Sequence, residues 1–172
     1  MIEEKELIQL SIKKDRLAQK KLFDNYSNSL FSTAFRIVSD YDLAQDIIQE
    51  SFIEVFRDLK SFNNTSPLFF WIRTIVIRKA IKALKKNDRF EILEDDIAST
   101  GFNSDFTAEE LDKAILKLPH SCRSIFVMIE VEGYKHKEVA ELLNISEGTS
   151  KSQLNYSKKL LRELLKEIYD ER

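Results

Sequence analysis

The chain has 172 residues and a formal net charge of −2, a length that suits one domain of ordinary size or two small ones. It contains no apolar run long enough to cross a bilayer and no N-terminal signal pattern, so we expect a cytoplasmic protein. The single cysteine, Cys122, excludes a disulfide framework, fits a reducing cytosol and is expected to be a buried, unreactive thiol. Glycine and proline are few and apolar residues recur at helical spacing, which predicts an all-α fold.

The nearly neutral net charge conceals three segments of different sign. Residues 1–86 hold 15 Lys and Arg against 11 Asp and Glu, residues 87–107 hold 1 against 6, and residues 108–172 hold 11 against 12. A protein that binds DNA without a protein partner usually has a clear excess of cations. We therefore expect any DNA binding by this chain alone to be weak.

Residues 3–38 predict two short helices, and Ser39 and Asp40 then break the pattern and begin the next helix. Residues 42–59 predict a strong helix with an apolar core stripe on one side. Acidic residues recur every four positions on its other side: Asp42, Asp46, Glu50, Glu54 and Asp58.

Three apolar side chains, Leu43, Ile47 and Ile53, fall inside this acidic arc. Apolar residues framed by carboxylates favour a surface that docks on another protein. The alternative is a solvated face with isolated apolar residues, which is common. A carboxylate metal site is not expected, because no histidine lies near and the acids spread over several turns.

Residues 60–70 predict a loop rich in turn formers and aromatics, and residues 71–86 predict a helix with six cations and no acid. Cations beside aromatic rings suit single-stranded nucleic acid, because cations follow phosphates while rings stack on bases. Two alternatives stay open: cations that complement the helix dipole, or a helix that lies on a membrane surface.

Residues 87–107 predict an exposed, flexible acidic linker between two small helical domains. Thr107 and Glu110 form a capping box that begins a helix over 108–117. Pro119 begins another helix, which runs to about Glu132 and stops at Gly133.

Residues 133–165 predict a helix, a tight turn and a longer helix. Asn144 tolerates the left-handed conformation that such a turn needs, Ile145 is the apolar plug beneath it, and Ser146 caps the second helix. This pattern indicates a helix-turn-helix, whose second helix enters the major groove of DNA, and it completes a four-helix C-terminal domain. The alternative is an ordinary helical hairpin. His120 and His136 lie far from any acid–base constellation and are expected at the surface.

Three motifs in chain order resemble segments of the bacterial extracytoplasmic-function (ECF) sigma factors of the sigma-70 family. The first, DLAQDIIQESFIEVFRDLKSF, is similar to the segment that binds core RNA polymerase. The second, PLFFWIRTIVIRKAIKALKK, is similar to the segment that reads and opens the minus-10 promoter element. The third, LPHSCRSIFVMIEVEGYKHKEVAELLNISEGTSKSQL, is similar to the domain that binds the minus-35 element.

The resemblance implies three sets of site residues. The set for core polymerase is Asp42, Leu43, Asp46, Ile47, Gln49 and Glu50. The set for the minus-10 element is Phe62, Asn63, Asn64, Trp71, Arg78, Lys79 and Lys82. The set for the minus-35 element is Lys151, Ser152, Asn155, Tyr156 and Lys159.

The chain departs from the family pattern at several positions. Arg78 and Lys82 stand where Asn and Asp are usual. Gln153 and Tyr156 stand where Arg is frequent, so the recognition helix is poor in Arg, and this departure bears on which minus-35 sequence is read more than on whether one is read. Ser150 replaces a usual Val and is expected to weaken packing of the C-terminal domain.

The resemblance implies a protein that performs no chemistry and needs no cofactor. Its partners would be core RNA polymerase, promoter DNA and an anti-sigma factor, which in this family is often membrane-anchored; no small-molecule substrate is implied. Two rival functions remain at this point: a helix-turn-helix regulator that binds duplex DNA alone, and a helical scaffold or membrane-surface protein that uses residues 71–86.

Overall fold

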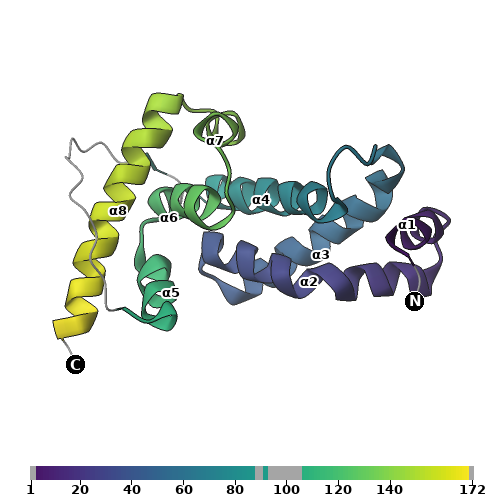
Figure 1. Cartoon of the computed structure of the whole chain (residues 1–172), viewed down its shortest axis with the longest axis horizontal. Coiled ribbons are helices and arrows are strands. Elements are labelled where there is room, and N and C mark those ends of the chain that lie inside the picture. Colours follow the sequence, from purple (N-terminus) through teal and green to yellow (C-terminus); the bar gives the residue numbers. More distant parts are fainter. Residues whose placement is uncertain (1–2, 88–90, 93–105, 171–172) are drawn as a thin grey trace. The chain divides into compact units, whose positions relative to one another are not determined.

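The computed structural model describes residues 3–87, 91–92 and 106–170, and within these ranges the regular structure is entirely helical (Figure 1). The first half contains α1 (Glu4–Ile12), α2 (Arg16–Val38), α3 (Tyr41–Asp58), the 3₁₀ turn η1 (Leu59–Ser61) and α4 (Leu68–Lys86). The second half contains α5 (Ala108–Lys117), α6 (His120–Phe126), the π-helical turn η2 (Val127–Val131), α7 (His136–Leu143) and α8 (Glu147–Asp170). The predicted all-α fold is confirmed.

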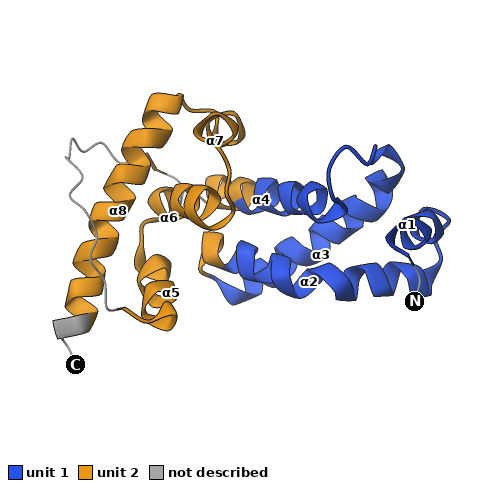
Figure 2. Cartoon of the chain, viewed as in Figure 1, with its two compact units in different colours: residues 1–35, 40–80 blue, residues 36–39, 81–172 orange. Residues whose placement is uncertain are grey.

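The chain divides into two compact units, which Figure 2 colours separately. Unit 1 comprises residues 1–35 and 40–80, and unit 2 comprises residues 36–39 and 81–172. The predicted linker, residues 87–107, lies almost wholly outside the described residues. Among the described residues, none of the helices combines the length and the apolar character that a bilayer-crossing segment needs.

Unit 1 is built around an apolar core that α2, α3 and α4 share. Leu22, Leu30, Val55 and Ile72 are fully buried in it, and Phe23 of α2 meets Phe52 of α3 edge to face with ring centroids 4.7 Å apart. As predicted, α3 begins at a break: Asp40 is its N-cap and accepts a hydrogen bond from the backbone N–H of Leu43 at 3.0 Å.

The helix α4 begins at Leu68, three residues earlier than the sequence pattern predicted. The cause is local, because the carbonyl of Pro67 accepts from the N–H of Phe70 at 3.0 Å and Leu68 is buried at 1% exposure. The apolar residues that looked like part of an aromatic loop therefore form the first turn of the helix.

In unit 2, α5, α6 and α7 each pack against α8. The capping box of Thr107 and Glu110 is present at the start of α5, which confirms both the cap and the predicted bounds of this helix. The core contains Ile125, Met128, Leu143 and Leu165, all of which are almost completely buried.

The predicted single helix from Pro119 to about Glu132 is interrupted. After α6 the backbone widens into η2, where the N–H of Glu132 donates to the carbonyl of Val127, five residues earlier, at 2.9 Å. Gly133 then ends the helix in the left-handed conformation with φ +73°, as predicted.

Candidate nucleic-acid and protein interfaces

The turn between α7 and α8 has the geometry that the sequence predicted for a helix-turn-helix. Asn144 ends α7 in the left-handed conformation with φ 58° and ψ 51°, and the N–H of Ile145 donates to the carbonyl of Ala140 at 3.0 Å. The Ser146 hydroxyl accepts from the N–H of Thr149 at 2.9 Å and so caps α8. The residues within this turn were therefore sufficient to predict its geometry from the sequence.

A hydrogen bond between α7 and α8 was not predicted. Ser150 is fully buried, and its Oγ lies 2.9 Å from Nδ1 of the half-buried His136. His136 is thus only partly at the surface, where it was expected to be exposed. The Ser150 hydroxyl therefore has a hydrogen-bond partner and is not an unsatisfied buried polar group, while the expected weakening of packing at this position stays a prediction.

The side chains predicted to contact the minus-35 element lie on α8. Lys151, Ser152 and Asn155 are exposed, whereas Tyr156 and Lys159 are half-buried. Lys151, Asn155 and Lys159 follow one another at four-residue spacing, so they share one face of the helix. This face can present a cation, a hydroxyl and an amide side by side to the edges of base pairs.

The opposite side of α8 is fixed to α6 by polar contacts. The buried Ser157 hydroxyl lies 2.9 Å from the carbonyl oxygen of Cys122 and 2.6 Å from that of Gln153. The Sγ of Cys122 lies 3.9 Å from Oε1 of Gln153. Burial raises the pKa of the Cys122 thiol, which is fully buried, and this agrees with the prediction of an unreactive cysteine.

Arg123 is a buried cation that sequence reasoning did not single out. Its guanidinium donates to the carbonyls of Ile37 (3.0 Å), Leu116 (2.9 Å) and Leu118 (2.8 Å), and Nη2 lies 2.6 Å from Nδ1 of His120. Burial lowers the pKa of Arg123 to about 10, so the side chain stays charged at neutral pH. His120 is half-buried in this cluster, so it is only partly at the surface, where it was expected to be exposed.

The signal that could have revealed Arg123 is its surroundings. Arg123 is the single charged residue in the otherwise uncharged segment Ser121–Met128, a composition typical of a buried segment.

The acidic face of α3 is exposed, but one of its predicted apolar members is not part of it. Asp42, Asp46, Gln49 and Glu50 are exposed and Leu43 is half-buried, which leaves them accessible to a partner. Ile47 is only 4% exposed and belongs to the core, so its assignment to the docking surface needs correction.

The reason is that Ile47 lies three residues after buried Ala44 and four before buried Ser51, within the core stripe. Ile53, by contrast, is 70% exposed and supplies the apolar side chain of this face.

The cations of α4 differ in whether an ion pair occupies them. Lys79 forms an ion pair with Glu54 of α3 at 2.9 Å and lies 4.0 Å from Glu50. Arg78 and Lys82 are exposed and lie one helical turn apart. The predicted nucleic-acid patch on α4 therefore has Arg78 and Lys82 as its accessible cations, while Lys79 joins α4 to α3.

The loop over residues 62–67, which joins η1 to α4, is ordered by its own polar groups. Oδ1 of Asn63 accepts from the N–H of Thr65 at 3.1 Å and from its hydroxyl at 2.7 Å, and Asn64 has φ 56°. Phe62 and Trp71 are half-buried and their ring centroids are 5.5 Å apart. Exposed amides thus stand beside a pair of aromatic rings at the start of α4.

Metal chemistry is not indicated at any of these surfaces. Among the residues that the structure describes, no group of three or more His, Cys, Asp or Glu side chains is arranged to hold an ion.

Two family models match the chain in sequence order. Sigma-70 region 2 matches residues 22–90, and Sigma-70 region 4 matches residues 108–161. RNA polymerase sigma factor SigV of Bacillus subtilis is 27% identical over 141 residues, which cover 80% of this chain and 85% of SigV. ECF RNA polymerase sigma factor SigW of the same organism is 24% identical over 174 residues, covering 91% of this chain and 93% of SigW.

A solved structure supports the fold. The sigma factor RpoE of Bartonella quintana, crystallised in complex with the anti-sigma factor NepR, aligns with a TM-score of 0.55 at 24% identity, over 86% of this chain and 96% of RpoE.

Proposed function

The chain belongs to the sigma-70 family, within its ECF group, and from this premise we propose which of its surfaces meets each part of the transcription machinery. It is a sigma factor, which binds core RNA polymerase and promoter DNA and directs promoter-specific initiation of transcription. The observation that carries this conclusion is the pair of regional matches, in order, over residues 22–90 and 108–161.

We propose a division of the chain into three parts. Residues 1–86 would bind core polymerase and the minus-10 element, residues 87–107 would be the linker, and residues 108–172 would bind the minus-35 element. The match over residues 22–90 lies almost wholly within the first part and the match over residues 108–161 lies within the third, which supports the division.

The exposed face of α8 would read the minus-35 duplex in the major groove. Lys151, Ser152 and Asn155 would contact base edges, and each well-formed pair contributes about 1–3 kcal/mol of discrimination against the wrong base. Tyr156 and Lys159, farther along α8, would contact the groove wall or phosphates. The exposure of Lys151, Ser152 and Asn155 supports the role of these three residues in base contacts.

The loop and the first turns of α4 would capture the opened minus-10 strand. Asn63 and Asn64 would contact an extruded base, Phe62 and Trp71 would offer stacking surface, and Arg78 with Lys82 would follow the phosphates. Separating one stacked step costs about 1.4 kcal/mol, and stacking on an aromatic ring returns about 1–3 kcal/mol per base. Capture of one or two bases can therefore bias local opening, while the polymerase opens the rest.

The acidic face of α3 would dock on core polymerase. Asp42, Leu43, Asp46, Gln49 and Glu50 form this surface together with Ile53, which takes the place expected for Ile47. Exposed carboxylates around an accessible apolar side chain give both orientation and burial at a protein interface.

Binding to the promoter would depend on the polymerase. Residues 108–172 have about as many acids as cations, and affinity that is independent of sequence comes from neutralising phosphates. Two weak contacts gain strength when a scaffold holds them at the right distance, because the second becomes intramolecular. The chain would contribute binding and orientation rather than catalysis, and would work inside the cell without a cofactor.

An anti-sigma factor is the proposed regulator. RpoE of Bartonella quintana was solved with the anti-sigma factor NepR, and CnrH, a neighbour of similar fold at a TM-score of 0.55, was solved with the cytosolic domain of CnrY. A protein of this kind, in some cases anchored in a membrane, would cover the surfaces that bind polymerase and DNA.

The decisive experiment maps transcription start sites after forced expression and then reconstitutes one promoter with purified components. We expect RNA synthesis only with core polymerase, and a gel shift of duplex promoter that is much stronger with core polymerase than without it. Tight, specific binding by the chain alone would favour a stand-alone helix-turn-helix regulator instead. Absence of association with core polymerase would overturn the proposal.

A further inference from the structure

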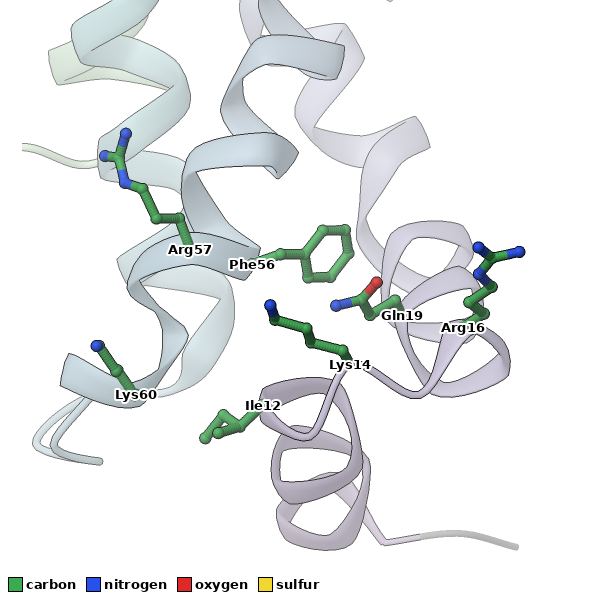
Figure 3. Close-up of a pocket in the computed structure, with 7 residues that line it drawn as sticks. All are labelled: Ile12, Lys14, Arg16, Gln19, Phe56, Arg57 and Lys60. Carbon is green, nitrogen blue, oxygen red and sulfur yellow. The ribbon is translucent and has the colours of Figure 1, made fainter.

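A basic pocket in unit 1 has no role in the surfaces described above. Its volume is about 850 Å³, within the range of small-molecule sites. Ile12, Gln19 and Phe56 line it together with four cations: Lys14, Arg16, Arg57 and Lys60. Figure 3 shows Arg16 on one side, Arg57 and Lys60 on the other, and the Lys14 side chain extending between them.

The four cations come from different elements, and they differ in whether a neighbouring carboxylate forms an ion pair with them. Arg57 forms a bidentate ion pair with its neighbour Asp58: Nε donates to Oδ1 at 2.9 Å and Nη2 donates to Oδ2 at 2.8 Å. Lys14, Arg16 and Lys60 form no ion pair with a described carboxylate. No described carboxylate lines the pocket. Asp58, next to it, offsets part of the charge of Arg57 and Lys60, but the four cations leave an excess of positive charge that favours an anion.

Lys14 is held in an unfavourable backbone conformation. Its φ is 65°, in the left-handed region that Gly and Asn adopt more readily than Lys. Its N–H donates to the carbonyl of Ser11 at 3.0 Å, and the next residue, Asp15, caps α2 by accepting from the N–H of Ala18 at 2.8 Å. This turn projects the ammonium group across the pocket, and such strain often accompanies a binding role.

The uncharged lining suits a flat, partly apolar group. Phe56 offers an aromatic face, and the amide of Gln19 is oriented because its Nε2 donates to the carbonyl of Ser11 at 3.1 Å. This leaves the amide oxygen of Gln19 to accept from an exocyclic amine. A ligand with a flat ring and a chain of phosphates would therefore fit the pocket. Its ring would match Phe56 and Gln19, and its phosphates would match the cations.

We propose that this pocket binds a nucleoside polyphosphate, with its phosphates on Lys14, Arg16 and Lys60 and its base against Phe56. The residues that we assign to promoter and polymerase contacts do not line the pocket. The proposal therefore stands independently of the proposed function.

Isothermal titration of the purified chain with ATP, inorganic tripolyphosphate and adenosine, in a buffer free of divalent cations, tests the proposal. We expect ATP to bind more tightly than tripolyphosphate and adenosine to bind far more weakly than either. Lys14→Asn should weaken ATP binding about ten-fold and Lys60→Gln about three-fold, because each removes a charge-assisted contact.

Lys21→Gln is the matched control, since Lys21 is an exposed cation of α2 outside the pocket lining. We expect it to change affinity by less than about two-fold. Lys14→Asn should also leave the melting temperature unchanged or raised, because Asn tolerates φ 65°. Loss of binding then cannot be attributed to loss of folding.

Three results would overturn the proposal. Adenosine binding as tightly as ATP would remove the role of the phosphates. An equal loss in Lys21→Gln and Lys14→Asn would indicate non-specific attraction to the basic segment. Displacement of ATP by a ten-nucleotide single-stranded DNA of higher affinity would assign the pocket to a nucleic-acid strand instead.

Discussion

The two helices that we propose for the promoter elements, α4 and α8, are anchored by different kinds of contact. The buried side chains of α4 are all apolar, and Ile72 and Val76 are fully buried among them. The N-terminal half of α8 buries three polar side chains, Ser150, Gln153 and Ser157, beside the apolar Leu154. Ser150 is hydrogen-bonded to His136 and Ser157 to a backbone carbonyl.

The difference has a physical consequence. Apolar packing has no preferred direction, whereas a hydrogen bond constrains both distance and angle. Polar contacts on successive turns therefore hold α8 in one rotation about its axis. A helix that presents neighbouring side chains to base edges needs that fixed rotation, while a helix that supports a strand-capturing loop chiefly needs stability.

The largest effect on stability is expected from the apolar anchor of α4. Ile72→Ala should lower the free energy of unfolding by about 3 kcal/mol, because it removes buried methyl groups and leaves a cavity. Denaturant unfolding followed by circular dichroism measures it. Lys82→Ala, an exposed change on the same helix, is the control and should cost under about 0.5 kcal/mol. A loss of less than about 1 kcal/mol for Ile72→Ala would contradict the tight packing of α4.

The next effect concerns promoter binding by α8. Asn155→Ala should weaken binding of the holoenzyme to its minus-35 element by about 1–3 kcal/mol and relax the preference at one base pair. Lys159→Ala should instead weaken binding to all sequences alike and reduce the salt dependence by about one phosphate contact. Competition gel shifts with single-base variants of the promoter separate these outcomes. Unchanged base preference in Asn155→Ala would remove this residue from direct readout.

A smaller effect is expected from the hydrogen bond between α7 and α8. A double-mutant cycle with His136→Ala and Ser150→Ala should give a coupling free energy of about 1 kcal/mol in unfolding experiments. A coupling close to zero would mean that the contact does not fix α8. In that case the contrast between α4 and α8 would lose its main support.

The smallest effect is expected at the neighbouring cations of α4. Lys79→Gln breaks the pair with Glu54, whose members are both partly exposed, and should cost at most about 1 kcal/mol of stability. Arg78→Gln should leave stability unchanged but reduce transcription from a duplex promoter about three-fold, since it removes a free phosphate contact. Equal losses of transcription in the two variants would show that Lys79 also contacts the strand.

The features that the sequence predicted well are those set by nearby residues. The capping box at Thr107, the left-handed Asn144 and the cap at Ser146 each depend on contacts within a few positions. The helix-turn-helix could be predicted from the sequence for the same reason. Of the residues predicted to contact the minus-35 element, Lys151, Ser152 and Asn155 are exposed and Tyr156 and Lys159 are half-buried, and their role stays a prediction.

The features that it missed depend on contacts between distant segments. Ile47 looked exposed because acids surround it in sequence, yet α3 is buried over a wider arc than its charge pattern suggests. The ion pair of Lys79 joins α4 to α3, and the Arg123 cluster gathers carbonyls from separate segments. Periodicity within one helix contains no information about such partners.

The π-helical turn η2 bears on how related chains should be aligned and altered. A π turn contains one residue more than an α turn, so deletion of one residue within Val127–Val131 would restore a regular helix. The chain that follows would keep nearly the same rotation about the helix axis, because the extra residue of a π turn adds length without adding a turn. The ion pair between Glu130 and Lys158, now 2.7 Å, is the contact next to this deletion that would have to adjust. We therefore expect relatives with a single-residue gap in this segment to present the helix-turn-helix in the same orientation.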